Sequence, residues 1–320
     1  EATRPSLPPA PRPPLPARPR TLAVTDIETW IRDPYALYAK RLLGLKPLQP
    51  IDADPGAAER GVMIHQALEL FLERHPKELP EKAIEELLEC GREAFGDALA
   101  RPGVLAFWWP RFERIAAWVV AQLEDLAAAG RWPAASEVTG EFRLADHDFS
   151  ARAKADRIDR LEDGGLAIVD YKTGGLPKAK EIKSGSAPQL ALEALIAQAG
   201  GFAEVDPAEV ALLSHWRLSG GDPAGEVKDV KAEMIDLMKD TRLGLERLVV
   251  AYDDAATPYR AKPRPALAPR WADYDHLARV REWSGGGAQR QTAETPQALV
   301  TPAAGGGGAT PEQRQAAEPE

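Results

Sequence analysis

The segment GGLAIVDYKTGG, residues 164–175, places three ionisable side chains at the end of an apolar run that is typical of a buried strand. The apolar run is Leu166 to Val169, and glycines stand on both sides of the segment as turn signals. Asp170, Tyr171 and Lys172 end the strand. Because charged groups are seldom buried without a partner or a task, the segment predicts a fold with a polar site at the end of a central strand.

The strand before this segment is expected to pair with it as a hairpin. It ends at Leu161, and residues 162–164 form the turn. A three-residue loop that ends in a left-handed glycine is a common hairpin connection and pairs Leu161 with Gly165. Counting back along both strands from that pair sets Asp156 opposite Asp170.

Facing carboxylates indicate a cation site. Paired residues of adjacent strands share a face with Cβ atoms about 5 Å apart, and two carboxylates that close repel each other. Hard divalent metals are the ions that such oxygen pairs usually hold. Two other interpretations stay open. A two-residue loop would turn Asp156 to the opposite face, and both aspartates could instead cap strand ends and pair with Arg157 or Lys172.

The composition is that of a soluble globular protein, with 44% apolar and 28% charged residues in a chain of 320. No apolar run reaches the roughly 18 residues of a membrane span, and the proline-rich start is unlike a secretion signal. Cys90 is the only cysteine, which excludes an internal disulfide and a thiolate metal cluster and favours a reducing cytoplasm. The net charge of −9 argues mildly against a self-sufficient nucleic-acid binder.

Patterns along the chain divide it into a linker, one domain and a tail. Residues 1–20 are rich in proline and arginine and are expected to form an extended linker. Residues 284–320 lack periodic hydrophobics and are expected to be disordered. The domain between them, residues 21–283, should begin with helices, the first capped by Thr25 with Glu28 in a capping box.

Strand patterns start at residue 137, include a short strand near VALLSHWRL, and are followed by further helices. This order predicts an α/β layer structure with a mixed sheet. Helical periodicity is expected over residues 26–33, 35–44, 58–74, 80–99, 104–129, 187–199 and 230–252.

The motif ADRIDRL…GGLAIVDYKTG resembles the core of the RecB-like branch of the PD-(D/E)XK nucleases. The chain as a whole resembles the C-terminal nuclease domain of AddB-type helicase–nuclease subunits, from about Pro8 to Trp283. The resemblance includes the segments TLAVTDIETWIRDPYALYAKRLLGL, ERGVMIHQALELFL, FWWPRFERIAAWV, PQLALEALIA and YDHLARVREWS. It implies a restriction-endonuclease-like core, with a mixed central sheet flanked by helices and an N-terminal helical portion.

The same resemblance implies a set of metal ligands. His65 in RGVMIH would bind a metal through a neutral imidazole nitrogen. Asp156 and Asp170 match the two motif aspartates and would be carboxylate ligands, and Tyr171 would lend its backbone carbonyl. Glu137 could be an additional outer ligand.

The resemblance also implies catalytic groups and marks two departures from the family. Lys172 would orient the attacking water, help it ionise, or stabilise charge on the phosphate. Gln189 matches the glutamine of a following helix, where the family usually continues Gln-X-X-X-Tyr, but Glu193 stands at the tyrosine position, so a DNA-facing tyrosine is missing. Other AddB proteins hold an iron–sulfur cluster with four cysteines. With Asp33 at the first of these positions and a single cysteine in the chain, that cluster cannot form.

The activity implied is hydrolysis of a DNA phosphodiester assisted by one or two Mg²⁺ ions, or Mn²⁺. The substrate would be DNA unwound by an AddA-type helicase subunit during double-strand-break repair and recombination. The alternative is a catalytically inactive module that docks the AddA subunit or clamps single-stranded DNA, which Glu193 and the absent cysteines favour.

Other polar and aromatic residues have structural interpretations. Trp108 and Trp109 could stack on a DNA base, but core packing is favoured because an apolar helix face continues through Phe107, Phe112, Ile115 and Trp118. A basic strip could follow a phosphate track or be a solvated loop; it comprises Lys172, Lys178, Lys180 and Lys183. Four histidines lack ligand-like spacing and are expected to be surface or structural residues: His75, His147, His215 and His276.

Overall fold

The structure is a computed structural model that describes residues 7–47, 56–269 and 272–284. The tail expected over residues 284–320 lies outside the described residues apart from Ser284. In the described part of the chain the strands are β1 (Thr21–Ala23), β2 (Trp132–Leu144), β3 (Phe149–Arg160), β4 (Leu166–Lys172), β5 (Val210–Leu218) and β6 (Gly225–Asp229). The α-helices are α1 (Val24–Arg32), α2 (Pro34–Leu37), α3 (Ala57–Arg74), α4 (Ala83–Phe95), α5 (Trp109–Ala128), α6 (Ala179–Lys183), α7 (Gln189–Gln198), α8 (Met234–Asp253) and α9 (Val280–Ser284).

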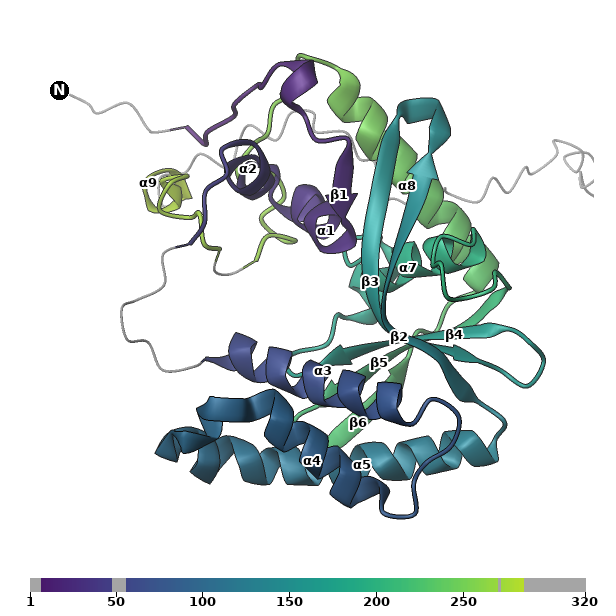
Figure 1. The fold of residues 1–320 in the computed structure, drawn as a ribbon. Coiled ribbons are helices and arrows are strands. Elements are labelled where there is room, and N and C mark those ends of the chain that lie inside the picture. The colour runs from purple at the N-terminus through teal and green to yellow at the C-terminus, as the bar shows by residue number, and fades with distance from the viewer. Residues whose placement is uncertain (1–6, 48–55, 270–271, 285–320) are drawn as a thin grey trace, which may run out of the picture.

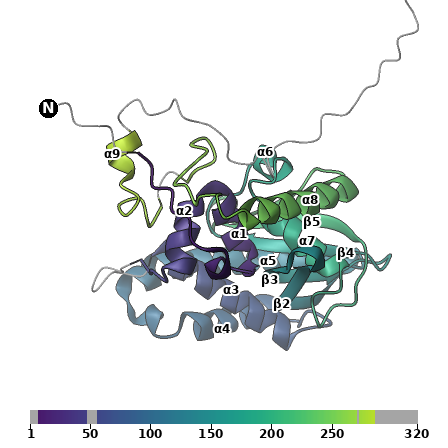
Figure 2. The same cartoon turned by 90° about the horizontal axis from the view of Figure 1, so that it is seen from above.

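The strands form one six-stranded mixed sheet with helices on both faces, as the sequence predicted (Figures 1 and 2). The strand order is β1-β3-β4-β5-β6, and β2 pairs with β3. The pairs β1–β3 and β4–β5 are parallel, whereas β2–β3, β3–β4 and β5–β6 are antiparallel. Since β2 runs along one edge of β3, β1 and β4 share its other edge, and the chain is consistent with a restriction-endonuclease-like fold.

Two separate apolar cores hold the helices to the sheet. One core joins α1, α7 and α8 to the sheet, and the other joins α3, α4 and α5 to its opposite face (Figure 1). Successive residues of β4 alternate between them, with Ile168 in the first core and Val169 in the second. A strand that is buried on both faces reads as a continuous apolar run, which explains the composition of β4.

The start of α1 differs from the expected capping box. The helix begins at Val24, with Ala23 as its N-cap and no side-chain cap, so Thr25 lies inside the first turn. Its hydroxyl is not the cap because β1 runs directly into the helix and burial of Leu22 and Val24 sets the boundary. The prediction of Thr25 as a cap was wrong.

The aromatic segment before α5 is partly exposed. Phe112 and Ile115 are buried as expected, but Phe107 is 72% exposed. Residues Val104–Trp108 form a π-helical turn, which holds more residues per turn than an α-helix and so shifts Phe107 off the apolar face. Trp109 packs in the core, with its ring edge-on to Phe95 at a centroid distance of 5.8 Å.

The described part of the proline-rich segment, residues 7–20, lies against the domain. The carbonyls of Pro11 and Pro9 accept hydrogen bonds from the amides of Tyr259 and Ala261 at 2.8 and 3.1 Å. Arg18 is buried at the C-terminal end of α8 and donates to backbone carbonyls there, including that of Tyr252 at 2.6 Å. The backbone is extended as expected, and it is also fixed along its length to the end of the chain.

The segment after α8 returns to α1 and α2. Asp33, the N-cap of α2, accepts hydrogen bonds from the amides of Ala36 at 3.3 Å and Lys262 at 3.2 Å. The Lys262 ammonium lies 2.6 Å from Asp275, which ties the returning segment to itself. Every helix in the described ranges is too short or too polar to serve as a membrane span.

Candidate metal and catalytic site

The β3–β4 turn has the geometry that the sequence predicted. Gly164 has a positive φ of 85°, and the amide of Leu161 donates to the carbonyl of Gly165 at 2.9 Å. The ladder that follows carries this register back along both strands, and one further pair sets Asp156 opposite Asp170. The alternative two-residue loop is excluded.

Four polar side chains thereby lie in one row across neighbouring strands. Asp170 on β4 pairs with His215 on β5. The β2–β3 register sets Glu137 opposite Asp156. The row therefore runs Glu137, Asp156, Asp170, His215, each from a different strand, through a sheet that is otherwise mainly apolar.

Asp156 stands where β3 and β4 separate. Its Oδ2 accepts a hydrogen bond from the backbone N–H of Tyr171 at 2.6 Å, and the ladder between the two strands ends at the next pair, Arg157 and Val169. A side-chain oxygen replaces a backbone carbonyl as the acceptor. Asp156 does not pair with Arg157, whose guanidinium lies 2.8 Å from Asp159 instead.

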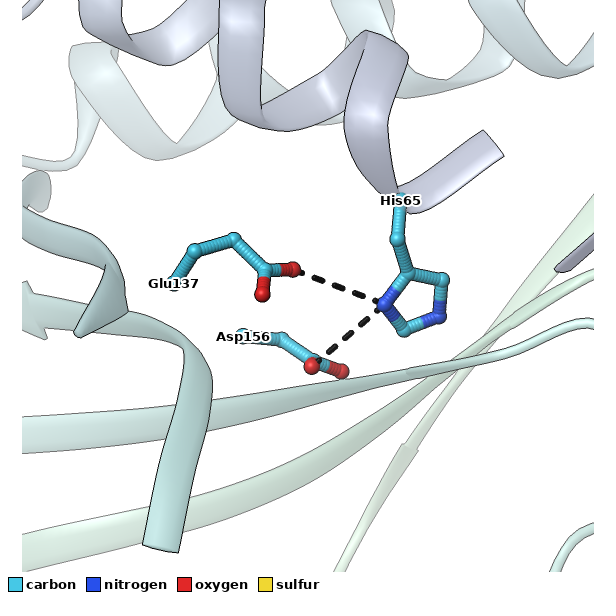
Figure 3. A group of neighbouring side chains, drawn as sticks. All are labelled: His65, Glu137 and Asp156. Atoms are coloured by element: carbon cyan, nitrogen blue, oxygen red, sulfur yellow. Dashed lines mark ion pairs between the residues drawn. The ribbon is translucent and has the colours of Figure 1, made fainter. Parts of the chain in front are cut away.

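His65 on α3 reaches into this opening and completes a compact group of donors. Its Nδ1 lies 3.4 Å from Asp156 Oδ1 and 3.6 Å from Glu137 Oε1 (Figure 3). One ligand atom from each of the three residues lies within 4.8 Å of the others, and within the described ranges this is the one such group of His, Cys, Asp or Glu. These residues could hold a metal ion.

The backbone aims two of these side chains. Glu137 has a φ of 50°, a strained left-handed conformation for a residue with a side chain, which redirects its carboxylate within β2. His65 Nε2 lies 3.1 Å from the carbonyl of Tyr171. Because a carbonyl can only accept, Nε2 carries a proton and Nδ1 faces the two carboxylates.

The charges of the compact group depend on one another. Burial works to lower the pKa of His65, but Asp156 and Glu137 outweigh it and raise this pKa to about 10. Burial works to raise the pKa of Glu137, but His65 and Lys154 lower it overall. Without a metal the group is therefore an imidazolium facing carboxylates.

Asp170 lies beside this group and is held by three donors. Its Oδ1 accepts hydrogen bonds from Lys172 Nζ and Gln189 Nε2, both at 2.7 Å, and its Oδ2 lies 3.0 Å from His215 Nδ1. The Asp170 side chain is 1% exposed, while that of Lys172 is 30% exposed. Lys172 therefore brings the buried carboxylate's partner to the protein surface.

Electrostatics keep this second set charged. Burial works to raise the pKa of Asp170, but His215 and Lys172 hold it below its ordinary value. Burial works to lower the pKa of Lys172, but Asp170 and Asp156 raise it, so the ammonium is retained. Asp156 differs, since its burial is not fully offset by His65 and its pKa is raised.

Glu193 lies on α7, one turn after Gln189, and it is buried rather than directed at a ligand in solvent. It is 1% exposed, and its Oε1 accepts a hydrogen bond from Gln189 Nε2 at 3.2 Å. Burial, and then the charges of Asp170 and Asp156, raise its pKa well above the ordinary value.

The back of the strand is held by an aromatic and guanidinium stack. The Tyr171 hydroxyl accepts from Arg157 at 3.2 Å, and the Arg157 guanidinium lies 4.2 Å from the ring centroid of Trp216. Burial raises the pKa of Tyr171 to about 12, so the phenol stays neutral. This packing fixes the backbone of Tyr171, whose amide and carbonyl contact Asp156 and His65.

The residues expected at the site all lie near the end of β4, in two adjoining sets. The compact group is His65, Glu137 and Asp156, and the hydrogen-bonded set is Asp170, Lys172 and Gln189. Asp170 lies outside the compact group, so the expected pairing of Asp156 with Asp170 as its centre is replaced by Asp156 with Glu137. His215 was not singled out, although a histidine inside the apolar strand VALLSHWRL is the same signal that identified Asp170.

Comparison with known proteins agrees with this architecture. A profile of the PD-(D/E)XK nuclease superfamily matches residues 21–279. An uncharacterised protein of Rickettsia bellii is 27% identical over 250 residues, which are 73% of this chain and 30% of that protein. A Rickettsia felis protein, also uncharacterised, is 31% identical over 191 residues, 58% of this chain and 22% of that protein.

A relative with a descriptive name is a subunit of the ATP-dependent helicase/deoxyribonuclease of Streptococcus mutans. It is 26% identical over 182 residues, 54% of this chain and 16% of that protein. The chain spans less than a third of the length of each of these relatives. The superfamily match extends from β1 to just before α9 and so contains the sheet, both helical layers and the polar row, and the chain belongs to the PD-(D/E)XK nuclease superfamily.

Proposed function

We propose that this chain is the nuclease domain of an AddB-type subunit of a helicase–nuclease complex, and that it hydrolyses phosphodiester bonds of unwound DNA with Mg²⁺ or Mn²⁺. The observation that carries the proposal is the position of the compact donor group beside the Asp170–Lys172 pair. Membership of the superfamily and similarity to the Streptococcus mutans protein support it.

The donor group suits a divalent metal. Carboxylate oxygens are the ligands that Mg²⁺ and Mn²⁺ prefer, and an imidazole nitrogen is compatible with Mn²⁺. Glu137 Oε1 is buried without a hydrogen-bond partner, and a cation would satisfy it. His65, Glu137 and Asp156 would hold the ion, with His65 neutral in the bound state. Asp170 and the Tyr171 carbonyl would complete the ligand set.

A bound metal would lower the pKa of a water molecule and offset charge on the scissile phosphate. Lys172, held between Asp170 and the Gln189 carbonyl oxygen at 3.1 Å, would keep its proton and stabilise charge on the phosphate oxygens. The hydrogen bond from His65 to the Tyr171 carbonyl would keep Nδ1 as the nitrogen that faces the ion.

The partner and the cellular role belong to the same proposal. An AddA-type helicase subunit would feed single-stranded DNA to this domain during double-strand-break repair and recombination in the cytoplasm. The net charge of −9 leaves much of the neutralisation of the DNA backbone to that partner.

The purified chain should cut a fluorescein-labelled single-stranded oligonucleotide in Mg²⁺ or Mn²⁺ and lose this activity in EDTA. Asp170→Asn and Lys172→Met should each lower the cleavage rate about 100- to 1,000-fold, the effect of removing one preorganised charge from a reacting site. Matched controls are Asp240→Asn and Lys239→Met on the exposed side of α8, which should cut at the parent rate.

Two outcomes would count against this function. Cleavage by Asp170→Asn and Lys172→Met at the parent rate would assign the activity to a contaminant. Binding of Mn²⁺ in calorimetry without cleavage of any oligonucleotide would instead favour the catalytically inactive module.

A further inference from the structure

The side-chain amide of Gln189 is held by three charged or polar groups. Its Nε2 donates to Asp170 Oδ1 at 2.7 Å and to Glu193 Oε1 at 3.2 Å, and its Oε1 accepts from Lys172 Nζ at 3.1 Å. A flipped amide would set its oxygen against two carboxyl oxygens and its NH₂ against an ammonium. One orientation of the amide is therefore strongly preferred.

Glu193 has no other partner in the described part of the chain. Gln189 is its one hydrogen-bond donor, and its Oε2 is buried without a partner. The surrounding residues of α7, Leu190 to Ala197, are all buried, and Glu193 is the only ionisable residue among them. An apolar side chain would fill this place without the cost of burying a carboxyl group.

Asp170 cannot position the amide alone. It is shared among Lys172, Gln189 and His215, whereas the Oε1 of Glu193 serves Gln189 only. Glu193 also lies at the position where the resembled family has a tyrosine directed at DNA, and here the buried side chain points at the amide instead.

We propose that Glu193 is a positioning residue that fixes the orientation of the Gln189 amide and, through its carbonyl oxygen, the place of the Lys172 ammonium. The kinetic consequence of this inference rests on the proposed function, but the orientation of the amide does not. Two independent measurements therefore test it, one of them without metal or DNA.

The first measurement is NMR of the metal-free chain labelled with ¹⁵N-glutamine, in which Gln189→Ala identifies the signals of the Gln189 amide. Glu193→Met removes the acceptor at similar length and should speed exchange of one amide proton with water by about 10-fold, as expected for one lost hydrogen bond. Glu193→Gln keeps an acceptor oxygen and should leave exchange close to that of the parent. Unchanged exchange in Glu193→Met would overturn the inference.

The second measurement is single-turnover cleavage of single-stranded DNA at saturating Mn²⁺. Glu193→Met should lower the rate about 10- to 100-fold, the usual effect of losing a support for a group at a metal site, and Glu193→Gln should restore it. In a Gln189→Ala background, Glu193→Met should cost nothing further, because its effect passes through the amide. Full additivity would overturn the inference.

A folding defect is separated from positioning by a second acceptor-free variant, Glu193→Leu, and by thermal melts of all variants. If Glu193→Met unfolds, Glu193→Leu takes its place in both measurements; loss of fold in both, with Glu193→Gln folded and its amide exchange unlike the parent's, would also overturn the inference. If the parent chain cuts no DNA but the NMR result holds, the proposed function fails and the positioning role stands.

Discussion

Asp170 and His215 form a buried contact between neighbouring strands, with Oδ2 3.0 Å from Nδ1. His215→Phe keeps the packing volume and removes the partner that fixes one carboxylate oxygen. Mn²⁺ affinity should fall about 10- to 100-fold, as when the outer partner of a metal ligand is lost. Isothermal titration calorimetry checks this, with exposed His276→Phe as the control. An affinity equal to that of the parent would leave His215 with packing as its only role.

His65 should make metal-free stability depend on pH. Its pKa is raised from 6.5 to about 10 in the folded chain by Asp156 and Glu137, against the opposing effect of burial. A raised pKa contributes stability that is fully present below pH 6.5 and is lost as the pH rises through about 10. In EDTA, the difference in free energy of unfolding between the parent and His65→Gln should shrink across this range. Urea titrations measure it, and a difference that grows with pH would contradict the assignment.

The candidate site could be predicted from sequence where it depends on the hairpin. The turn at Gly164 sets the register, and the register sets Asp156 against Asp170. The close contact of Glu137 with His65 could not be predicted in the same way, because it depends on a left-handed residue inside β2 and on the packing of α3. Neither feature has a local signature in the chain.

At the scale of elements, α4 and α5 approach each other at Gly91. A Cβ at this position would lie 2.1 Å from the Phe112 ring, which is fully buried and cannot yield. Gly91→Ala gains about 1 kcal/mol of helix propensity but overpacks the core by about 1–3 kcal/mol, so it should destabilise the chain. Urea unfolding tests this.

The control for Gly91 is Gly103→Ala, where a Cβ meets nothing within 4 Å and φ is −66°. It should leave stability unchanged or raise it by about 0.4–1 kcal/mol, because alanine restricts the unfolded chain. Equal effects at both positions would show that α4 and α5 are not as closely packed as described.

Long periodic elements were the most predictable part of the fold. The helix expected over residues 58–74 corresponds to α3, and the strand expected at VALLSHWRL is β5. β6 was missed, because all its residues after Gly225 are exposed and it lacks an apolar pattern. The π-helical turn before α5 was missed because it depends on packing beyond the local periodicity.

At the scale of the whole molecule, Arg18 joins the start of the described chain to the end of α8. Its guanidinium donates to the carbonyls of Tyr252, Asp254, Ala255 and Thr257 at 2.6–3.2 Å. Arg18→Met keeps the apolar stem and should lower the free energy of unfolding by about 2 kcal/mol, the scale of a lost charged hydrogen bond. An extended linker without such contacts would show no loss.

The matched control for Arg18 is Arg143→Met, since the Arg143 side chain is 68% exposed and lies 3.5 Å from Asp148. Its effect should stay within about 0.5 kcal/mol, as for most surface substitutions. The sequence identified the proline-rich composition of this segment but not its contacts, because its partners lie more than 200 residues away along the chain.

The pairing of the Pro9 and Pro11 carbonyls with the Ala261 and Tyr259 amides also sets where the domain would yield under load. These contacts are nearer to both ends of the described chain than any pair within β2–β6. Tension applied at the two ends would therefore strip away this outer clasp first. The strands that carry the ionisable row would remain mechanically shielded until the clasp had opened.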